Sequence, residues 1–550
     1  MKEFLDRVQS FSAENVIQEI SQITRFHRIQ GSKGLVDAAR HIQEKLKDLG
    51  IGAELIEEVY DGEQWYLTLQ TPVAWDLVEG SLEFEGKKMT TAHDPLLVMA
   101  HSPSGEADGE VISVDSPSIR GKIAIAGKDW QNAYRKACKN GAGGFIAYRS
   151  GTGDDFPYIG LFLRKKDLEY AKIPAIAVPE NLVKDVEGKG VKISVKTKIK
   201  DREIMPIVYA EIGKPPFILF SAHMCHPKPG ANDNASGSAM LIELARILKE
   251  IYDPSSRFGF AFLWIPEHYG TQAFIDRHAD MSRYYACINL DMVGGSSDRS
   301  GSHIMLVRTP LSRFSVVSGL IEHFLNKINV RSESFSGSQL QDLQFRAYPF
   351  STGSDHDVFN IFGIPSVMVI TWPDRHYHSS GDTIENLSSR TIEVIGKSVL
   401  ASALALADDS REDLESFARS CAKVYLGELG MQAKTEIAEK LVNEGAERDM
   451  GFIDDTHRRR TGKAGWIKWA KKGVISEDII EEKDHARFSD LEDLLPQLYE
   501  ILMLGERLSK KESFKALREE FREIDEKGIR ELLDIVARSG VVDTVKGKQR

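Results

Sequence analysis

Residues 208–405 alternate apolar runs of strand length with stretches whose apolar residues recur at helical spacing. The expected strands are PFILFSAH, GFAFLWIPE, YACINLDMV, IMLVRT and PSVMVITW, and the expected helices include SGSAMLIELARILKEIY, RFSVVSGLIEHFLNKI and TIEVIGKSVLASALALA. This alternation predicts an α/β fold with a mainly parallel, mixed sheet sandwiched by helices. Ligands of such folds bind at the carboxyl ends of the strands.

The pattern is interrupted before this block. Residues 1–70 read as helix, helix and strand, whereas residues 77–207 read as short strands separated by turns, with one helix at WQNAYRKACKNGA. Because the α/β pattern resumes afterwards, the β-rich part is expected to be inserted. We therefore expect a catalytic domain of residues 1–75 and 208–408, with an inserted domain of residues 76–207.

The remaining part, residues 409–550, is helical and highly charged. Three helices with short turns and a final RSGVV predict a winged-helix-like module. A basic run (Arg458, Arg459, Arg460, Lys463, Lys468, Lys471 and Lys472) is interpreted as a linker or solvated surface. For this module we favour a role in oligomerisation or substrate gating over DNA binding, and a homo-oligomer stays open.

Composition and charge narrow the expected partners and the expected cellular compartment. A formal net charge of -11 argues against general nucleic-acid binding by the whole chain. The N-terminus lacks the apolar core of a signal peptide, and no run of eighteen apolar residues occurs. Four cysteines are scattered without a CxxC pair, which is typical of a reducing compartment. We therefore expect a cytoplasmic location and no membrane partner.

Polar side chains follow the carboxyl ends of several predicted strands. They are His223, His226 and Asp233 after the first strand, Glu267 and His268 after the second, Asp291 after the third, and His376, Tyr377 and His378 near the end of the block. Because strand ends in such a sheet share one edge, these groups are expected to converge. Imidazole and carboxylate are the ligands that zinc prefers in open catalytic sites.

The chain resembles the di-zinc aminopeptidase family, which includes bacterial leucyl aminopeptidases and, more distantly, glutamate carboxypeptidase. The matching motifs are GANDNASG, PEHYGT, NLDMVG, GSDHDVF with GIPSVMV, and YHSSGDTIENL. The inserted part resembles a protease-associated domain, in GKIAIAG, KACKNGAGGFIAYRS and IPAIAVP. The resemblance implies two zinc ions, with cobalt or manganese as alternatives. It also implies Asp233 as the bridging ligand, Glu267 as general base, Asp291 and His378 as further ligands, and Tyr377 as an oxyanion donor.

Two positions depart from the family pattern. The family usually has His-x-Asp on the first strand, but here Cys225 occupies the Asp position and a second histidine follows. His226 is favoured as the ligand, with His223 as its rival. His268 stands where the family usually has a metal-binding glutamate, which removes one negative charge.

The expected function is a metal-dependent aminopeptidase acting on peptides. Three alternatives are a non-catalytic, peptidase-like binding or regulatory protein, a glutaminyl-cyclase-like acyltransferase with one zinc, and a DNA-binding regulator that uses the C-terminal module. Bound metal, the nature of the product and a salt-dependent gel shift distinguish them.

Overall fold

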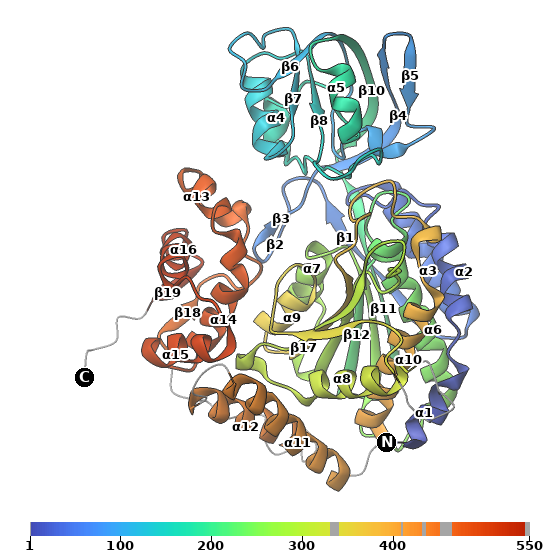
Figure 1. Cartoon of the computed structure of the whole chain (residues 1–550), viewed down its shortest axis with the longest axis vertical. Coiled ribbons are helices and arrows are strands. Elements are labelled where there is room, and N and C mark those ends of the chain that lie inside the picture. Colours follow the sequence, from blue (N-terminus) through green and yellow to red (C-terminus); the bar gives the residue numbers. More distant parts are fainter. Residues whose placement is uncertain (1, 331–339, 409–410, 432–435, 452–464, 545–550) are drawn as a thin grey trace.

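The computed structural model describes residues 2–330, 340–408, 411–431, 436–451 and 465–544. Figure 1 shows a large α/β body in the middle, a smaller β-rich body above it and a helical body at its side. We call residues 76–207 the insert and residues 465–544 the C-terminal module. No helix in the described ranges is long and apolar enough to cross a membrane.

The α/β body is built on an eight-stranded sheet with the order β1-β11-β13-β12-β14-β17-β15-β16. Strands β13, β12, β14 and β17 at its centre are parallel, while β1, β11 and the β15–β17 pair add antiparallel contacts. This confirms the predicted mixed sheet. The strand bounds are β1 Ala53–Tyr60, β11 Glu203–Ile212, β12 Phe217–His223, β13 Gly259–Ile265, β14 Tyr284–Leu290, β15 His303–Val307, β16 Phe345–Tyr348 and β17 Ser366–Trp372.

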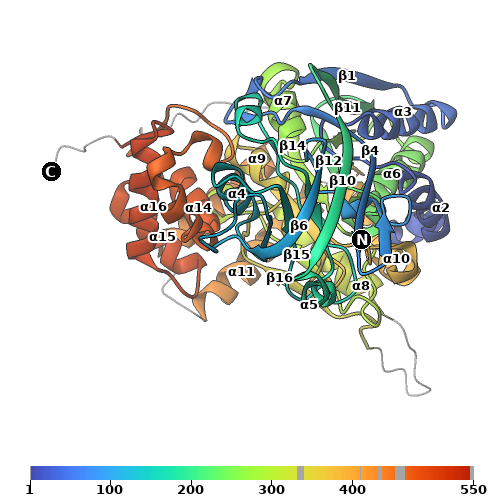
Figure 2. The same cartoon turned by 90° about the horizontal axis from the view of Figure 1, so that it is seen from above.

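The central strands β12, β13 and β14 are buried along their whole length because helices cover both faces of the sheet. Figures 1 and 2 show α2, α3, α6 and α10 on one side and α7 and α9 on the other. The helix bounds are α2 Ala13–Ile23, α3 Lys33–Asp48, α6 Gly237–Ile251, α7 Tyr269–Arg277, α8 Val316–Ile328, α9 His356–Ile361 and α10 Ser389–Asp408.

The insert contains most of a second, seven-stranded sheet with the order β5-β4-β10-β6-β7-β8-β9. Its bounds are β4 Ala74–Phe84, β5 Lys87–Thr90, β6 Gly105–Ser113, β7 Ile123–Ala126, β8 Gly144–Ala147, β9 Ala175–Ala177 and β10 Gly190–Lys200, with α4 at Trp130–Lys139 and α5 at Val183–Val186. The main chain enters this sheet shortly after β1 and leaves it just before β11. The insert is therefore tied to the α/β body at the β1–β11 edge.

The C-terminal part begins with α11 (Arg411–Gly430) and α12 (Glu436–Gly451). The C-terminal module then packs α14 (Leu495–Gly505), α15 (Lys510–Glu520) and α16 (Glu526–Arg538) beside a two-stranded sheet of β18 (Ile467–Trp469) and β19 (Val542–Thr544). Residues 458–460 and 463 of the predicted basic run lie outside the described residues. The module contacts both other bodies, since Glu500 accepts from Ser312 and Asp478 pairs with Arg164 of the insert.

Candidate metal centre

The parallel strands bring the predicted site residues to one edge of the sheet. His223 is the last residue of β12, Asp291 directly follows β14, and Glu267 lies two residues beyond β13. Asp233 lies in the turn between β12 and α6, and His378 lies in the loop after β17. The convergence follows from the topology, because parallel strands end on the same side.

A first group of potential ligands consists of His223, Asp233 and Asp291, all buried. His223 Nε2 lies 3.4 Å from Asp233 Oδ1 and 3.2 Å from Asp291 Oδ1. Burial alone would lower the pKa of His223, but Asp291 and Glu267 raise it well above its usual value. One buried imidazole thus faces two buried carboxylates.

A second group consists of His226, Asp233 and His378. His226 Nε2 lies 3.2 Å and His378 Nε2 3.1 Å from the same oxygen, Asp233 Oδ2. His223 and His226 are therefore not rivals for a single ligand position. Each belongs to a different group.

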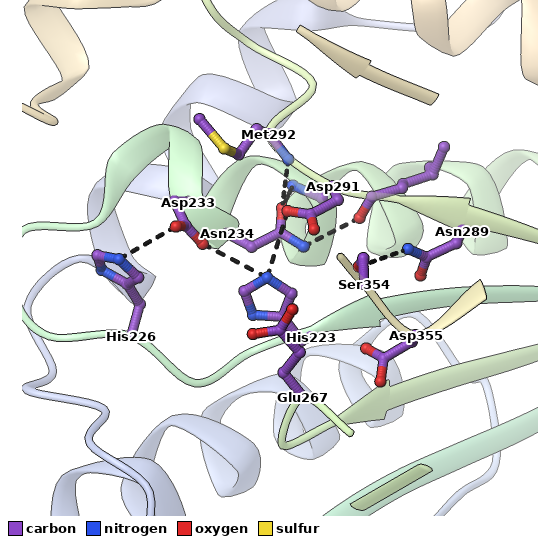
Figure 3. Close-up of polar contacts among 12 residues, drawn as sticks. His223, His226, Asp233, Asn234, Glu267, Asn289, Asp291, Met292, Ser354 and Asp355 are labelled. Carbon is purple, nitrogen blue, oxygen red and sulfur yellow. Dashed lines mark hydrogen bonds and ion pairs between the residues drawn. The ribbon is translucent and has the colours of Figure 1, made fainter. Parts of the chain in front are cut away.

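Asp233 joins the two groups, since its carboxylate lies between His223 and His226 (Figure 3). Its Oδ1 faces His223, and its Oδ2 faces His226 and His378. Burial would raise the pKa of Asp233, but His226 and His378 outweigh it and hold the pKa well below its usual value. Asp233 is thus an ionised carboxylate whose two oxygens point toward two different ligand sets.

The histidine rings are held with one nitrogen free for the centre. His223 Nδ1 donates to the Cys225 carbonyl at 3.1 Å, and His226 Nδ1 donates to the Pro227 carbonyl at 3.0 Å. Nδ1 bonds of this kind leave the Nε2 lone pair available to a metal. His226 Nε2 is buried without a hydrogen bond of good geometry. These donors fit two divalent ions sharing Asp233.

Hydrogen bonds between side chains and the backbone hold the Asp233 turn. Asp382 accepts from the Asn232 and Asp233 backbone N–H groups at 2.7 and 2.9 Å, and Asn234 accepts from Met292 N and donates to the Leu290 carbonyl. Burial raises the pKa of Asp382 to about 7. Sequence reasoning did not assign these two residues a role. Their only signal was membership in the motifs GANDNASG and YHSSGDTIENL.

Glu267 lies beside the first group, and Figure 3 shows its carboxylate next to the His223 ring. Burial raises the pKa of Glu267 well above its usual value. Cys225 Sγ accepts from the Glu267 backbone N–H at 3.1 Å. The residue that replaces the usual Asp therefore contacts the proposed base directly, while its carbonyl orients His223.

Besides Glu267, two predicted site residues, His268 and Tyr377, lie outside these groups. His268 belongs to neither, and its Nε2 is 3.8 Å from Glu267 Oε1. Its backbone N–H donates to Asp355, a buried carboxylate whose pKa burial raises to about 6. Tyr377 stacks on the His378 ring with centroids 3.7 Å apart.

The insert contributes Tyr158 to the second group, a residue that sequence reasoning missed. Its ring lies 5.1 Å from that of His226 and 5.2 Å from that of His378. Its backbone N–H donates to the His378 carbonyl at 2.7 Å, and Ser380 N donates to the Phe156 carbonyl at 2.9 Å. The local sequence does not predict this pairing, because residues 156–158 and 378–380 are over 200 residues apart.

A cavity of about 370 Å³ opens onto the second group. Its walls include Glu267, Cys225 and Arg28 of the α/β body, and Trp130, Arg149 and Tyr158 of the insert. All three Arg28 nitrogens donate to backbone carbonyls, including those of Met224 and Gly230. The cavity thus lies between the ligand groups and the insert, and has the size of a small-molecule site.

Fold and donor set together define the zinc-peptidase class, and comparison with known proteins agrees. Residues 208–403 match the model of peptidase family M28. The chain is 25% identical to aminopeptidase YwaD of Bacillus subtilis over 379 residues, which is 59% of this chain and 72% of that protein.

Solved structures share the fold. The zinc aminopeptidase BSAP from Bacillus subtilis superposes with a TM-score of 0.52 at 19% identity, covering 72% of this chain and 96% of that one. A putative peptidase from Clostridium acetobutylicum superposes with a TM-score of 0.54 at 14% identity, covering 83% and 97%. The resemblance to the di-zinc aminopeptidase family is confirmed over residues 208–403, which match the peptidase family M28 model, and the similarities support a zinc metallo-aminopeptidase.

Proposed function

We propose that this protein removes N-terminal residues from peptides at a centre holding two zinc ions. The observation that carries the proposal is the division of the Asp233 carboxylate between two ligand groups. His223 and Asp291 would complete one coordination set, and His226 and His378 the other. His268 stays outside both sets in this proposal.

Bound zinc would supply an activated water and polarise the scissile carbonyl. Glu267 is the proposed general base: its carboxylate takes a proton from the attacking water and delivers it to the leaving amine. Tyr377 is the proposed donor to the developing oxyanion. With both histidine Nδ1 atoms tied to carbonyls, the rings keep Nε2 directed at the centre throughout.

The loss of the usual glutamate at position 268 does not empty the second set. His226 faces Asp233 Oδ2 beside His378, so an imidazole supplies the third donor. The set carries one negative charge less than a Glu-containing one. We expect weaker retention of the ion at this position than at the first, because a carboxylate attracts a divalent cation more strongly than a neutral imidazole.

The test uses the full-length protein loaded with zinc, a panel of unblocked peptides and the same peptides with acetylated N-termini. Release of N-terminal amino acids from unblocked peptides alone supports the proposal. Cleavage of blocked peptides, cyclised products, or a protein that binds no zinc would contradict it. The last result would favour the non-catalytic alternative.

A further inference from the structure

The insert places one arginine in the cavity without a partner. The Arg149 guanidinium makes no hydrogen bond or ion pair with the residues that the structure describes, and it lies over the Trp130 ring, 5.1 Å from the ring centroid. The other arginines nearby are committed, since Arg28 donates to carbonyls and Arg164 pairs with Asp478 at 2.8 Å. Arg149 is therefore the available cation in this cavity.

Keeping a half-buried cation unpaired is costly, and burial lowers the pKa of Arg149. The tryptophan holds the guanidinium in place through a cation–π contact, so it is ready to receive a planar anion. Such an arrangement is favourable when the counter-ion arrives with the ligand. A carboxylate is the anion that a guanidinium binds best in peptides.

The start of α4 adds to this positive potential. Trp130 and Gln131, its first two residues, line the cavity, and Asp129 forms no side-chain cap on the helix. The first N–H groups of a helix have no partner within it and favour negative charge.

One acidic group of the insert lies close to this positive potential. Asp129 also lines the cavity, but it accepts from Asn132 at 2.9 Å and acts on the pKa of Glu477 in the C-terminal module. Asp129 is thus engaged by Asn132, whereas Arg149 lines the same cavity as His378 of the ligand loop.

We infer that Arg149, braced by Trp130, binds the C-terminal carboxylate of a short peptide whose N-terminal bond lies at the metal centre. The inference rests on the proposed function and specifies its substrate class as di- and tripeptides with a free C-terminus. A cavity of about 370 Å³ has room for a ligand of this size, and every such peptide carries this carboxylate.

The test compares alanylalanine with its C-terminal amide, using the zinc-loaded full-length enzyme. The wild-type kcat/KM is expected to favour the free acid by about tenfold to a hundredfold, the range for a charge-assisted bond. Arg149→Met should remove this preference by lowering the value for the acid alone, with zinc content unchanged. Arg149→Lys should retain part of it.

Arg120→Met is the matched control, because Arg120 is exposed on the same insert and does not line the cavity. Equal losses for acid and amide in Arg149→Met would overturn the subsite, as would no loss. Two further substrates are alanylaspartate and alanylasparagine, each with an amidated C-terminus. A preference for the aspartate peptide, without a preference for a free C-terminus, would overturn the C-terminal assignment. If wild type cleaves neither alanine substrate nor longer unblocked peptides, the proposed function itself fails.

Discussion

The two ligand groups differ in the parts of the chain that build them. His223 and Asp291 of the first group lie at the ends of neighbouring parallel strands, whose register holds them together. His226 and His378 of the second group lie in loops, and the insert packs Tyr158 against both rings. The first group is thus a property of the sheet, and the second depends on contacts between distant segments.

This difference predicts that the two proposed ions bind with unequal affinity. A site on rigid strands needs little reorganisation to bind, whereas a loop-borne site keeps its geometry only while the loops are held. We expect the first group to bind more tightly and the second to respond to changes in the insert.

Asp233→Asn should have the largest effect, because this carboxylate serves both groups. We expect loss of both ions and a fall in kcat of roughly a thousandfold or more. Zinc content by mass spectrometry and peptide cleavage check this. A variant that keeps both ions would refute the shared-carboxylate assignment.

Glu267→Gln should leave both groups intact while removing the base. We expect kcat to fall by about a hundredfold to ten-thousandfold, with zinc content unchanged. The contrast with Asp233→Asn separates proton transfer from metal binding. Full activity in this variant would rule out the proposed mechanism.

His226→Ala tests the second group by itself. One ion should be lost or bound at least about a hundredfold more weakly, since a direct ligand matters more than the surrounding shell. His268→Ala, a histidine close to Glu267 but outside both groups, is the matched control and should keep both ions. Loss of an ion in His268→Ala but not in His226→Ala would show that the ligand is at position 268, as in the family pattern.

Tyr158→Ala tests whether the insert supports the loop-borne group. Removing the ring that packs on His226 and His378 should weaken the second ion by about tenfold and leave the first unchanged. Tyr158→Phe keeps the ring and should bind both ions like the wild type. Stepwise zinc titration measures the two affinities, and equal weakening of both ions would contradict the contrast.

The smallest effect concerns a different pair of buried carboxylates. Glu500 and Glu520 of the C-terminal module face the α/β body, where they accept from Ser312 and Leu311. Burial raises the pKa of Glu500 to about 7, and burial with Glu500 nearby raises that of Glu520 well above its usual value.

Groups with raised carboxyl pKa values keep their protons longer in the folded state than in the unfolded state. Stability is therefore lost as pH rises from about 4.5 through 7. Glu520→Gln should reduce this loss, because one of the two buried carboxyl groups then no longer titrates. Thermal unfolding at pH 5 and pH 8 gives the measurement. An unchanged pH dependence would show that Glu500 and Glu520 do not cause this loss of stability.

Much of the site could be predicted from sequence because of where its residues lie on strands. Apolar runs of strand length located β12, β13 and β14, and the polar residues at or just beyond their ends are His223, Glu267 and Asp291. Parallel pairing makes this step reliable, since it needs only that the strands share a sheet.

The partition of His223 and His226 could not be read in the same way. Both follow one strand, and a family-based alignment offers them one position. Only the fold of the turn, anchored by Asp382 and Asn234, directs one Asp233 oxygen to each.

The sequence by itself determined the mixed sheet, the edge where the site lies and most of its chemical groups, because hydrophobic periodicity and strand ends are local properties. Only the tertiary structure decided which side chains come together in each candidate ligand group, that His268 lies outside both groups, and that Tyr158 and Arg149 of the insert line the cavity beside them. These contacts depend on packing between segments far apart in the chain, and a local sequence pattern does not predict which distant segment a loop will contact.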